Sequence, residues 1–286
     1  MTLYKVCYPC CMVILQRDVS AMPCIYCNSS QLGDLKEHTS LGYRQWRCYD
    51  CKKQFNERTA TPFNRISYRT EIVVLVVYHR LRFKLSLDDV VELMATRNVF
   101  ISHQTVQNWT QWFGPVLGIQ LRKFRRNTNG KKWHVDHTEI KVSGRTCYLY
   151  RCFDKNGDLV DVMLSDNKSH DAAESFFYQC HDTAGFEPDM ITTDQEAALE
   201  SGLKEVFGER VEHRKSKYMN NRLEQDHRAP KSRYRPMKGF GDEFAAMNFL
   251  HSFEELRQHL RAKGCTRSEK RRKSPSKIND LVSLVA

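Results

Sequence analysis

Apolar residues stand at positions 133 and 135 and again at 140 and 142, with polar residues between them, as expected for a strand over residues 133–143. Similar strand patterns cover residues 146–153 and 159–164, and the segment 154–158 between them is rich in turn formers. These three strands should form an antiparallel meander. Their order with the later elements predicts an α/β fold, in which helices cover a mixed sheet. Those later elements are helices at about 170–183, 195–207 and 240–262, a helix around Glu224, and strands at 189–193 and near 211.

Residues 68–121 carry a helical pattern instead. An apolar helix is expected over residues 72–83, and Ser86 followed by Asp89 marks the capped start of a second helix. A third helix should begin at residue 102 or 103 and run to 113. Three helices with a short turn before the last predict a helix-turn-helix domain.

The third helix has one apolar stripe, formed by Val106, Trp109 and Phe113. Polar residues gather near its start, where a recognition helix presents side chains to base edges. The alternative is a plain three-helix bundle in which Trp109 and Trp112 are only core residues. The candidate DNA-binding residues are Gln104, Thr105, Gln107 and Asn108.

Six of the eleven cysteines form Cys-x-x-Cys pairs within residues 1–67. Two pairs, Cys24/Cys27 and Cys48/Cys51, have twenty residues between them, which is the spacing of a four-thiolate structural zinc site. A zinc ribbon of this size has a small core, so the metal supplies the folding energy. The third pair, Cys7/Cys10, either joins a second metal site or replaces one of the other pairs.

The net charge of +11 is unevenly divided. Residues 1–130 have 18 basic and 9 acidic side chains (+9), residues 131–210 have 9 and 16 (−7), and residues 211–286 have 18 and 9 (+9). Basic arms suit the phosphate backbone of nucleic acid, and an acidic centre suits cations. Chance scatter of charge in a globular protein is the alternative.

The chain shows no segment that should enter a membrane. Its longest apolar run, residues 72–77, is too short to span a bilayer, and its first residues carry no clear signal peptide. We therefore expect a cytoplasmic, nucleoid-associated protein.

Three acidic residues lie in separate predicted elements. Asp136 interrupts the strand 133–143, Asp194 follows the strand 189–193, and Glu224 opens a polar helical segment. Three such carboxylates can converge on a pair of hard divalent cations, an arrangement that catalyses in-line phosphoryl transfer.

Two of these acids also have structural explanations. Asp194 has the position of a helix N-cap. Glu224 lies three residues after Asn221, as in a capping arrangement, and four before Arg228, as in an ion pair. Asp136 has no such role, because an acid in the middle of a strand gains nothing structurally.

The segments around the acids form a specific pattern. They read Trp-His-Val-Asp-His-Thr at 133–138, Tyr-Leu-Tyr-Arg at 148–151, Ile-Thr-Thr-Asp at 191–194 and Asn-Asn-Arg-Leu-Glu-Gln-Asp-His-Arg at 220–228, and Lys231 and Gly239-Phe240 continue them. Over residues 133–262 this pattern resembles the transposases of the IS6 group of bacterial insertion sequences, with its IS240 relatives.

The resemblance implies an RNase H-like fold and a DDE triad of Asp136, Asp194 and Glu224 that holds two Mg²⁺ (or Mn²⁺) ions. It also implies cleavage at the ends of a mobile element, attack of the freed 3′-OH on target DNA, and a copy-forming outcome. The partners would be double-stranded DNA and at least a second copy of the chain. Lys231 and His227 should share the helix face of Glu224 and meet a DNA end, with Arg228 as a further DNA contact.

His137 departs from the group, which usually has a second acid directly after the first Asp. Because successive strand residues point to opposite faces, His137 should not share the metal site.

These patterns divide the chain into five parts. They are a zinc ribbon (1–67), a helix-turn-helix domain (68–121), a basic linker (122–132), an RNase H-like catalytic domain (133–262) and a basic flexible tail (263–286). Two other functions stay open at this point. One is a non-catalytic DNA-binding protein, either a domesticated transposase or a zinc-ribbon regulator, and the other is a metal-dependent nuclease without strand transfer.

Overall fold

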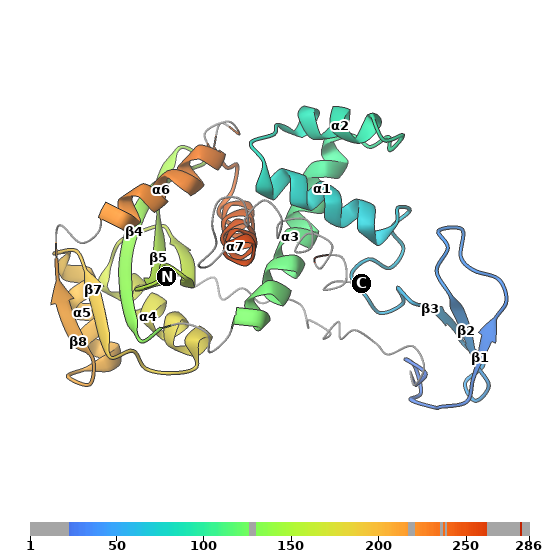
Figure 1. Ribbon diagram of the computed structural model, residues 1–286, viewed down its shortest axis with the longest axis horizontal. Helices are drawn as coiled ribbons and strands as arrows, with labels where there is room; N and C mark the ends of the chain where they lie inside the picture. Colours follow the sequence, from blue (N-terminus) through green and yellow to red (C-terminus); the bar gives the residue numbers. More distant parts are fainter. Residues whose placement is uncertain are drawn as a thin grey trace. The chain divides into compact units, whose positions relative to one another are not determined.

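The computed structural model describes residues 23–125, 130–216, 221–234, 237, 239–261 and 281, without the side chains of 124, 125 and 221–227. Cys7, Cys10 and nearly all of the expected basic tail therefore lie outside the described residues. The described residues fall into two compact units (Figure 1), 23–75 with 281 and 76–261.

The first unit contains a small antiparallel sheet of β1 (Leu32–Leu35), β2 (Gln45–Cys48) and β3 (Gln54–Asn56), in that order. Trp46 of β2 lies opposite Phe55 of β3, with ring centroids 5.8 Å apart. These two rings, with Cys24 and Cys48, are the buried residues of the core. A core of this size supplies little stability by itself, so the segment depends on a further cross-link.

Three helices follow: α1 (Thr70–Arg82), α2 (Leu87–Ala95) and α3 (His103–Arg125). The predicted start of α2 is confirmed as a capping box. The Ser86 hydroxyl accepts a hydrogen bond from the backbone N–H of Asp89, and the Asp89 carboxylate accepts one from the backbone N–H of Ser86. α3 is longer than the predicted helix, which ended at residue 113, and its last four residues lie in the expected linker.

α3 continues past residue 113 because it packs along α7 (Glu243–Leu260). A Cβ atom on Gly114 would lie 3.1 Å from Ser252 Oγ, and one on Gly118 would lie 3.4 Å from Ser252 Cα. Glycine at both positions lets the two helix backbones approach closely. The gain from this packing offsets the hydrogen bond lost at Pro115 within α3.

A five-stranded mixed sheet lies at the centre of the second unit, in the order β6-β5-β4-β7-β8. β4, β5 and β6 are antiparallel, and β7 and β8 run parallel to β4. This is the sheet of an RNase H-like fold, as the sequence predicted. Its elements are β4 (Lys132–Val142), β5 (Arg145–Asp154), β6 (Leu159–Ser165), α4 (His170–Ala184), β7 (Met190–Thr193), α5 (Ala197–Phe207), β8 (Glu212–Lys215) and α6 (Asn221–Tyr234).

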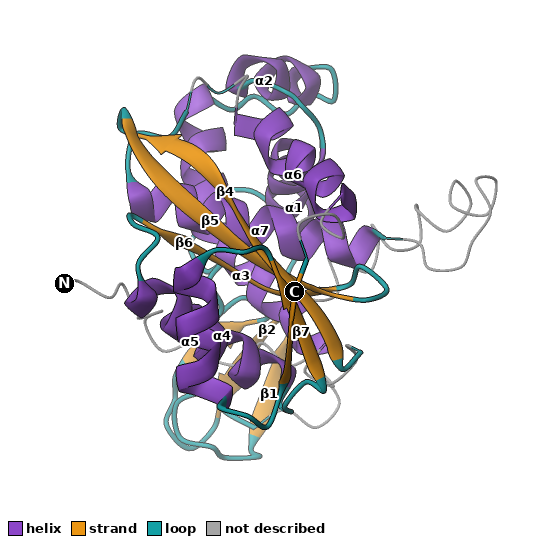
Figure 2. Ribbon diagram, turned by 90° about the vertical axis from the view of Figure 1, so that its left-hand side faces the viewer, coloured by secondary structure: helices purple, strands orange, loops and turns teal. Residues whose placement is uncertain are grey.

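One face of the sheet has an aromatic core. Trp133 of β4 and Tyr150 of β5 pack there with side chains from α4 and α5, among them Phe176 and Phe207. Figure 2 shows α4 and α5 side by side near the sheet. Gly202 makes their close crossing possible, since a Cβ atom there would lie only 2.8 Å from the backbone nitrogen of Glu174.

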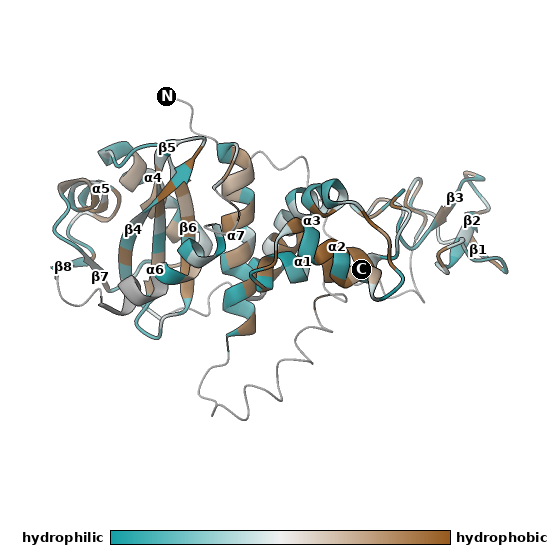
Figure 3. Cartoon of the chain, turned by 90° about the horizontal axis from the view of Figure 1, so that it is seen from above, coloured by the Kyte–Doolittle hydropathy of each residue, from teal (hydrophilic) through white to brown (hydrophobic). Residues whose placement is uncertain are grey.

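The other face carries buried charges. Arg151 of β5 forms an ion pair with Glu254 of α7, with 2.9 Å between Nη2 and Oε1, and both side chains are almost fully buried. Arg122 of α3 pairs with Asp161 of β6 and with Glu255 of α7. Figure 3 shows hydrophilic as well as hydrophobic residues along α7. These ion pairs fix the position of α7 against the sheet and α3.

Candidate active site

Asp136 and Asp194 lie next to each other at the ends of parallel segments. β4 and β7 pair in register, with Lys132 opposite Met190 and His134 opposite Thr192. Two residues further along each segment come Asp136 and Asp194, so the ladder brings them to the same level. Oxygen atoms of the two carboxylates lie within 4.8 Å of each other.

Asp194 is not the N-cap of α5, although that role was open to it from the sequence. The N-cap of α5 is Glu196, and Asp194 Oδ1 accepts a hydrogen bond from the Glu196 backbone N–H at 3.1 Å. Asp136 Oδ1 accepts one from the backbone N–H of His137 at 2.7 Å. These short local bonds fix both carboxylates while leaving them partly exposed.

The third predicted acid, Glu224, lies on α6, and this helix packs against β4. Lys231 lies seven positions after Glu224 on the same helix and is half-buried, and Arg228 is exposed. The side chains of Glu224 and His227 lie outside the described residues, as does the proposed cap at Asn221. The structure therefore packs the helix that carries the third acid against the strand of the first.

Arg233 anchors the C-terminal half of α6. Its Nη2 donates hydrogen bonds to the backbone carbonyl oxygens of Arg80 and Leu81, at 2.9 and 2.8 Å, and also to that of Phe83. Burial, with the charges of Arg80 and Arg82, lowers the pKa of Arg233 to about 10. Its positive charge lies against the C-terminus of α1, where the helix dipole favours cations. Nothing in the sequence marks this residue, because an arginine in a basic helix gives no sign of being buried.

His137 lies close to the two acids, contrary to the expectation that its side chain would point away from them. One of its ring nitrogens lies within 4.8 Å of oxygens of both Asp136 and Asp194. The buried positions of β4 change from 133 and 135 to 138, 140 and 142, so that Asp136 and His137 are both partly exposed, and β7 ends at Thr193 while β4 continues to Val142. His137 lies beyond the end of β7. No β7 residue lies beside it, so side chains from the two faces of the sheet can meet there.

Glu196 and Lys168 complete this cluster, and neither was predicted from the sequence. His137 Nδ1 lies 3.0 Å from Glu196 Oε2, an ion-pair distance without the alignment of a full hydrogen bond. Lys168 Nζ lies 3.4 Å from the other oxygen, Oε1. As N-cap of α5, Glu196 makes no side-chain capping bond, so its carboxylate serves the cluster instead. The sequence signal that could have identified Glu196 is its position two residues after Asp194.

The donor atoms fit a hard divalent cation. Oxygens of Asp136 and Asp194 are the ligand type that Mg²⁺ and Mn²⁺ prefer. Two opposite ligands of an octahedral Mg²⁺ are about 4.2 Å apart, given bond lengths of about 2.1 Å. The observed separations, all within 4.8 Å, need little adjustment to reach that geometry.

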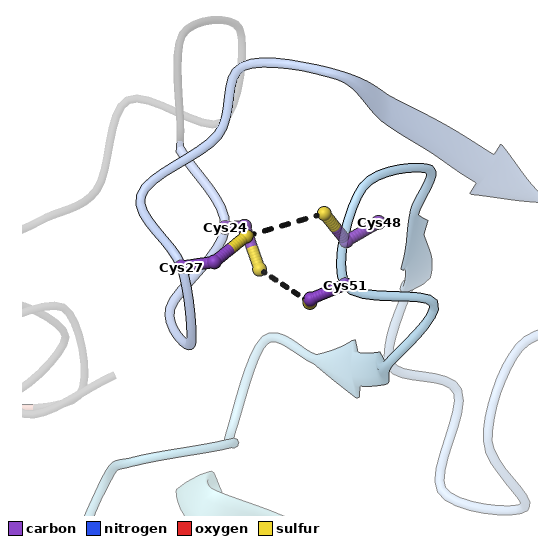
Figure 4. A group of neighbouring side chains, drawn as sticks. All are labelled: Cys24, Cys27, Cys48 and Cys51. Atoms are coloured by element: carbon purple, nitrogen blue, oxygen red, sulfur yellow. Dashed lines mark hydrogen bonds between the residues drawn. The ribbon is translucent and has the colours of Figure 1, made fainter.

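The four predicted cysteines come together in the first unit (Figure 4). Cys24 Sγ lies 3.6 Å from Cys51 Sγ, and Cys27 Sγ lies 3.6 Å from Cys48 Sγ. A disulfide would bring two sulfurs to about 2.05 Å, whereas ligands of a tetrahedral zinc ion at about 2.3 Å are about 3.8 Å apart. Backbone N–H groups of Cys51 and Asp50 lower the pKa of Cys48, whereas desolvation and the neighbouring thiols raise the pKa of Cys27, so Cys48 ionises before Cys27.

The predicted DNA-contact residues occupy the first two turns of α3. Gln104 and Gln107 are exposed, and Thr105 and Asn108 are half-buried. Gln104 donates a hydrogen bond to the side chain of Asn108 at 2.9 Å. Val106, Trp109 and Phe113 are buried, which confirms the apolar stripe. These polar side chains thus form one face of the helix.

Within the part of the chain that the structure describes, no helix has the length and apolar character needed to cross a membrane.

Comparison with known proteins places the chain beside bacterial transposases. The DDE domain model of IS240-type transposases matches residues 130–263. The transposase for insertion sequence-like element IS431mec of Staphylococcus aureus is 32% identical over 175 residues, 60% of this chain and 77% of that protein. The S. aureus transposase for IS257 in transposon Tn4003 matches with the same identity and coverage. Among solved structures, the HTLV-2 integrase catalytic core in complex with magnesium (trimeric form) aligns with a TM-score of 0.37 and 14% identity, covering 50% of this chain and 94% of that one.

Proposed function

The chain belongs to the IS6 family of DDE transposases, and we propose that it binds the ends of a mobile element and joins them to target DNA. We assign the catalysis to Asp136, Asp194 and Glu224. The observation that carries this assignment is the meeting of the Asp136 and Asp194 carboxylates at the ends of paired parallel segments. The packing of α6, which bears Glu224, against β4 supports the third position.

Asp136, Asp194 and Glu224 would hold the Mg²⁺ (or Mn²⁺) ions. When bound, such ions neutralise developing charge on the phosphate and activate water. The chain's own contribution is position. The β4–β7 register sets the level of Asp136 and Asp194, and backbone N–H donors orient each carboxylate. Water and the 3′-OH of the cut strand act as nucleophiles, so the reaction needs no Ser or Tyr nucleophile from the protein.

The DNA partner is double-stranded, first at the element ends and then at the target. Gln104, Thr105, Gln107 and Asn108 are assigned to base edges at the element ends. Lys231, Arg228 and His227 are assigned to the DNA near the cut. Because two ends must be joined in one reaction, the active form contains at least two copies of the chain.

Cys24, Cys27, Cys48 and Cys51 are assigned to a structural zinc ion. The sulfur–sulfur distances of 3.6 Å and the small core of the ribbon support this assignment. The chain is then organised as a zinc ribbon (1–67), a helix-turn-helix domain (68–121), a linker (122–132), the catalytic domain (133–262) and a basic tail (263–286).

A strand-transfer assay tests the proposed function. The full chain, loaded with zinc and given Mg²⁺, is incubated with DNA carrying the element's end sequence and with a supercoiled target plasmid. The proposal predicts joined products in which a 3′ end of the element is linked to target DNA. Glu224→Gln should abolish cleavage and joining together while leaving binding of the end DNA intact.

Two results would contradict the proposal in different ways. Cleavage without joined products would indicate a metal-dependent nuclease. Tight binding of end DNA with neither cleavage nor joining would indicate a protein that kept only its DNA-binding function.

A further inference from the structure

His137 has the surroundings of a metal ligand. A ring nitrogen lies within 4.8 Å of oxygens of Asp136 and Asp194, so the three residues can reach one ion. The ring is largely buried, with only 15% of the side chain exposed. The rings of Tyr148 and Tyr150 hold it, with centroids 5.6 and 5.7 Å away. Its position is therefore fixed before any ion binds.

Glu196 determines which ring nitrogen is available. A histidine that binds a metal almost always has its other nitrogen against a carboxylate, carbonyl or water, which fixes the tautomer and the ring orientation. Here Nδ1 faces Glu196 Oε2 at 3.0 Å, and Lys168 holds the second oxygen of Glu196 at 3.4 Å. A proton on Nδ1 leaves Nε2 with the lone pair that a metal needs.

We infer that His137 is a ligand, through Nε2, of a cation held by Asp136 and Asp194, with Glu196 as the residue that positions its ring. The inference rests on the proposed function, because it assumes that the two acids bind metal. It adds a nitrogen to a site otherwise built from oxygens. Mg²⁺ strongly prefers oxygen ligands, whereas imidazole binds transition metals well. The site should therefore prefer Mn²⁺ to Mg²⁺.

Pulsed electron paramagnetic resonance of bound Mn²⁺ tests this inference directly. The probe is Mn²⁺ alone, added to the full zinc-loaded chain without DNA. An imidazole nitrogen bound to Mn²⁺ produces a ¹⁴N modulation of the electron spin echo, which carboxylate and water oxygens do not. Wild type should show this modulation, and so should His38→Gln, a control at an exposed histidine that belongs to none of the three groups of side chains that could hold a metal ion.

Three variants test whether the ¹⁴N modulation comes from His137 and how much His137 and Glu196 contribute to Mn²⁺ affinity. His137→Gln should lose the modulation and bind Mn²⁺ at least about tenfold more weakly, since losing even a supporting partner of a ligand costs about 10–100-fold. Glu196→Gln should keep the modulation and weaken Mn²⁺ binding by about tenfold. His137→Glu should lose the modulation and reverse the preference, so that Mg²⁺ competes with Mn²⁺ more effectively than in wild type.

The outcomes separate this inference from the proposed function. Mn²⁺ binding that depends on Asp136 but shows no ¹⁴N modulation in wild type would overturn the role of His137 alone. A modulation that persists in both His137 variants would also overturn it. Mn²⁺ binding that Asp136→Asn leaves unchanged would overturn both, because the acids would then not form the site. The wild-type spectrum is decisive even where a variant fails to fold.

Discussion

Asp136 and Asp194 lie at the same level of the sheet because β4 and β7 pair in register up to His134 and Thr192, two residues before each acid. A shift of one residue between these strands would place the two carboxylates at different levels and on opposite faces. The metal site is thus set by strand register. Two sets of contacts fix this register: the aromatic core on one face of the sheet and the buried ion pairs on the other face.

Gly202 should be intolerant of a side chain. In Gly202→Ala the new Cβ would lie 2.8 Å from a backbone atom of α4, so the two helices must move apart. Overpacking of this kind costs about 1–3 kcal/mol, although alanine gains about 1 kcal/mol of helix propensity. We expect a net loss of up to about 2 kcal/mol in urea unfolding. Gly241→Ala is the control, because its Cβ meets nothing within 4 Å, and a loss as large there would contradict the packing argument.

Arg233→Met should loosen α6. The change removes hydrogen bonds to three carbonyl oxygens near the end of α1 and a buried charge. Hydrogen bonds to charged groups contribute about 1.5–3 kcal/mol each, and part of that gain is offset by desolvation of the arginine, so we expect a net loss of about 2–3 kcal/mol.

Hydrogen exchange of α6 amides should accelerate in Arg233→Met more than exchange of α4 amides. Arg228→Met, an exposed change on the same helix, should leave both stability and exchange unchanged. Equal acceleration in α4 and α6 would indicate global destabilisation instead of a local anchor.

Loss of zinc should unfold the ribbon. Structural zinc sites contribute about 10–16 kcal/mol of apparent binding free energy, far more than the buried residues of this core can replace. Cys48→Ser should reduce the zinc content of the protein from about one ion to near zero, with loss of the Trp46 near-ultraviolet circular dichroism signal. Cys147→Ala, at a buried cysteine outside the cluster, should keep the full zinc content. Retention of zinc by Cys48→Ser would contradict the assigned ligands.

Gln107→Ala should weaken recognition of the element end. Gln107 is exposed on the first turns of α3, where it can reach base edges. A lost base contact costs about 1–3 kcal/mol, or about 5–150-fold in affinity, and affects specific DNA only. Fluorescence anisotropy with end DNA and with random DNA of equal length measures the difference. An equal loss for both DNAs would show that Gln107 contacts the backbone and does not read bases.

Much of the catalytic domain was predictable because its elements are locally encoded. The strand over residues 133–143, the turn at 154–158 and the Ser86–Asp89 capping box each depend on neighbours within a few residues, and the structure has all three. The length of α3 was not predictable. Gly114 and Pro115 look like a helix end, and only the packing of Gly114 and Gly118 on α7 shows why the helix continues.

Residues of the candidate site were predictable where they belong to a motif on one segment. They were not predictable where the site depends on contacts between segments far apart in the sequence. Asp136 and Asp194 follow from the family pattern and the strand positions. The side-chain direction of His137 was predicted wrongly. Alternation of side chains separates the two faces inside a sheet, whereas β7 ends before it reaches the level of His137. Glu196 and Arg233 act through contacts with His137 and with α1, and no spacing within their own segments reveals those contacts.

Single-turnover strand transfer by the acid variants tests the central claim most directly. Asp136→Asn and Asp194→Asn should each reduce joining of end DNA to target by about 10³-fold or more, since a catalytic metal ion supplies several kcal/mol of transition-state stabilisation. Asp189→Asn is the matched control, at an acid just before β7 whose side chain is exposed and paired with Lys131; it should join DNA at the wild-type rate. Wild-type joining by Asp136→Asn or Asp194→Asn would contradict the account.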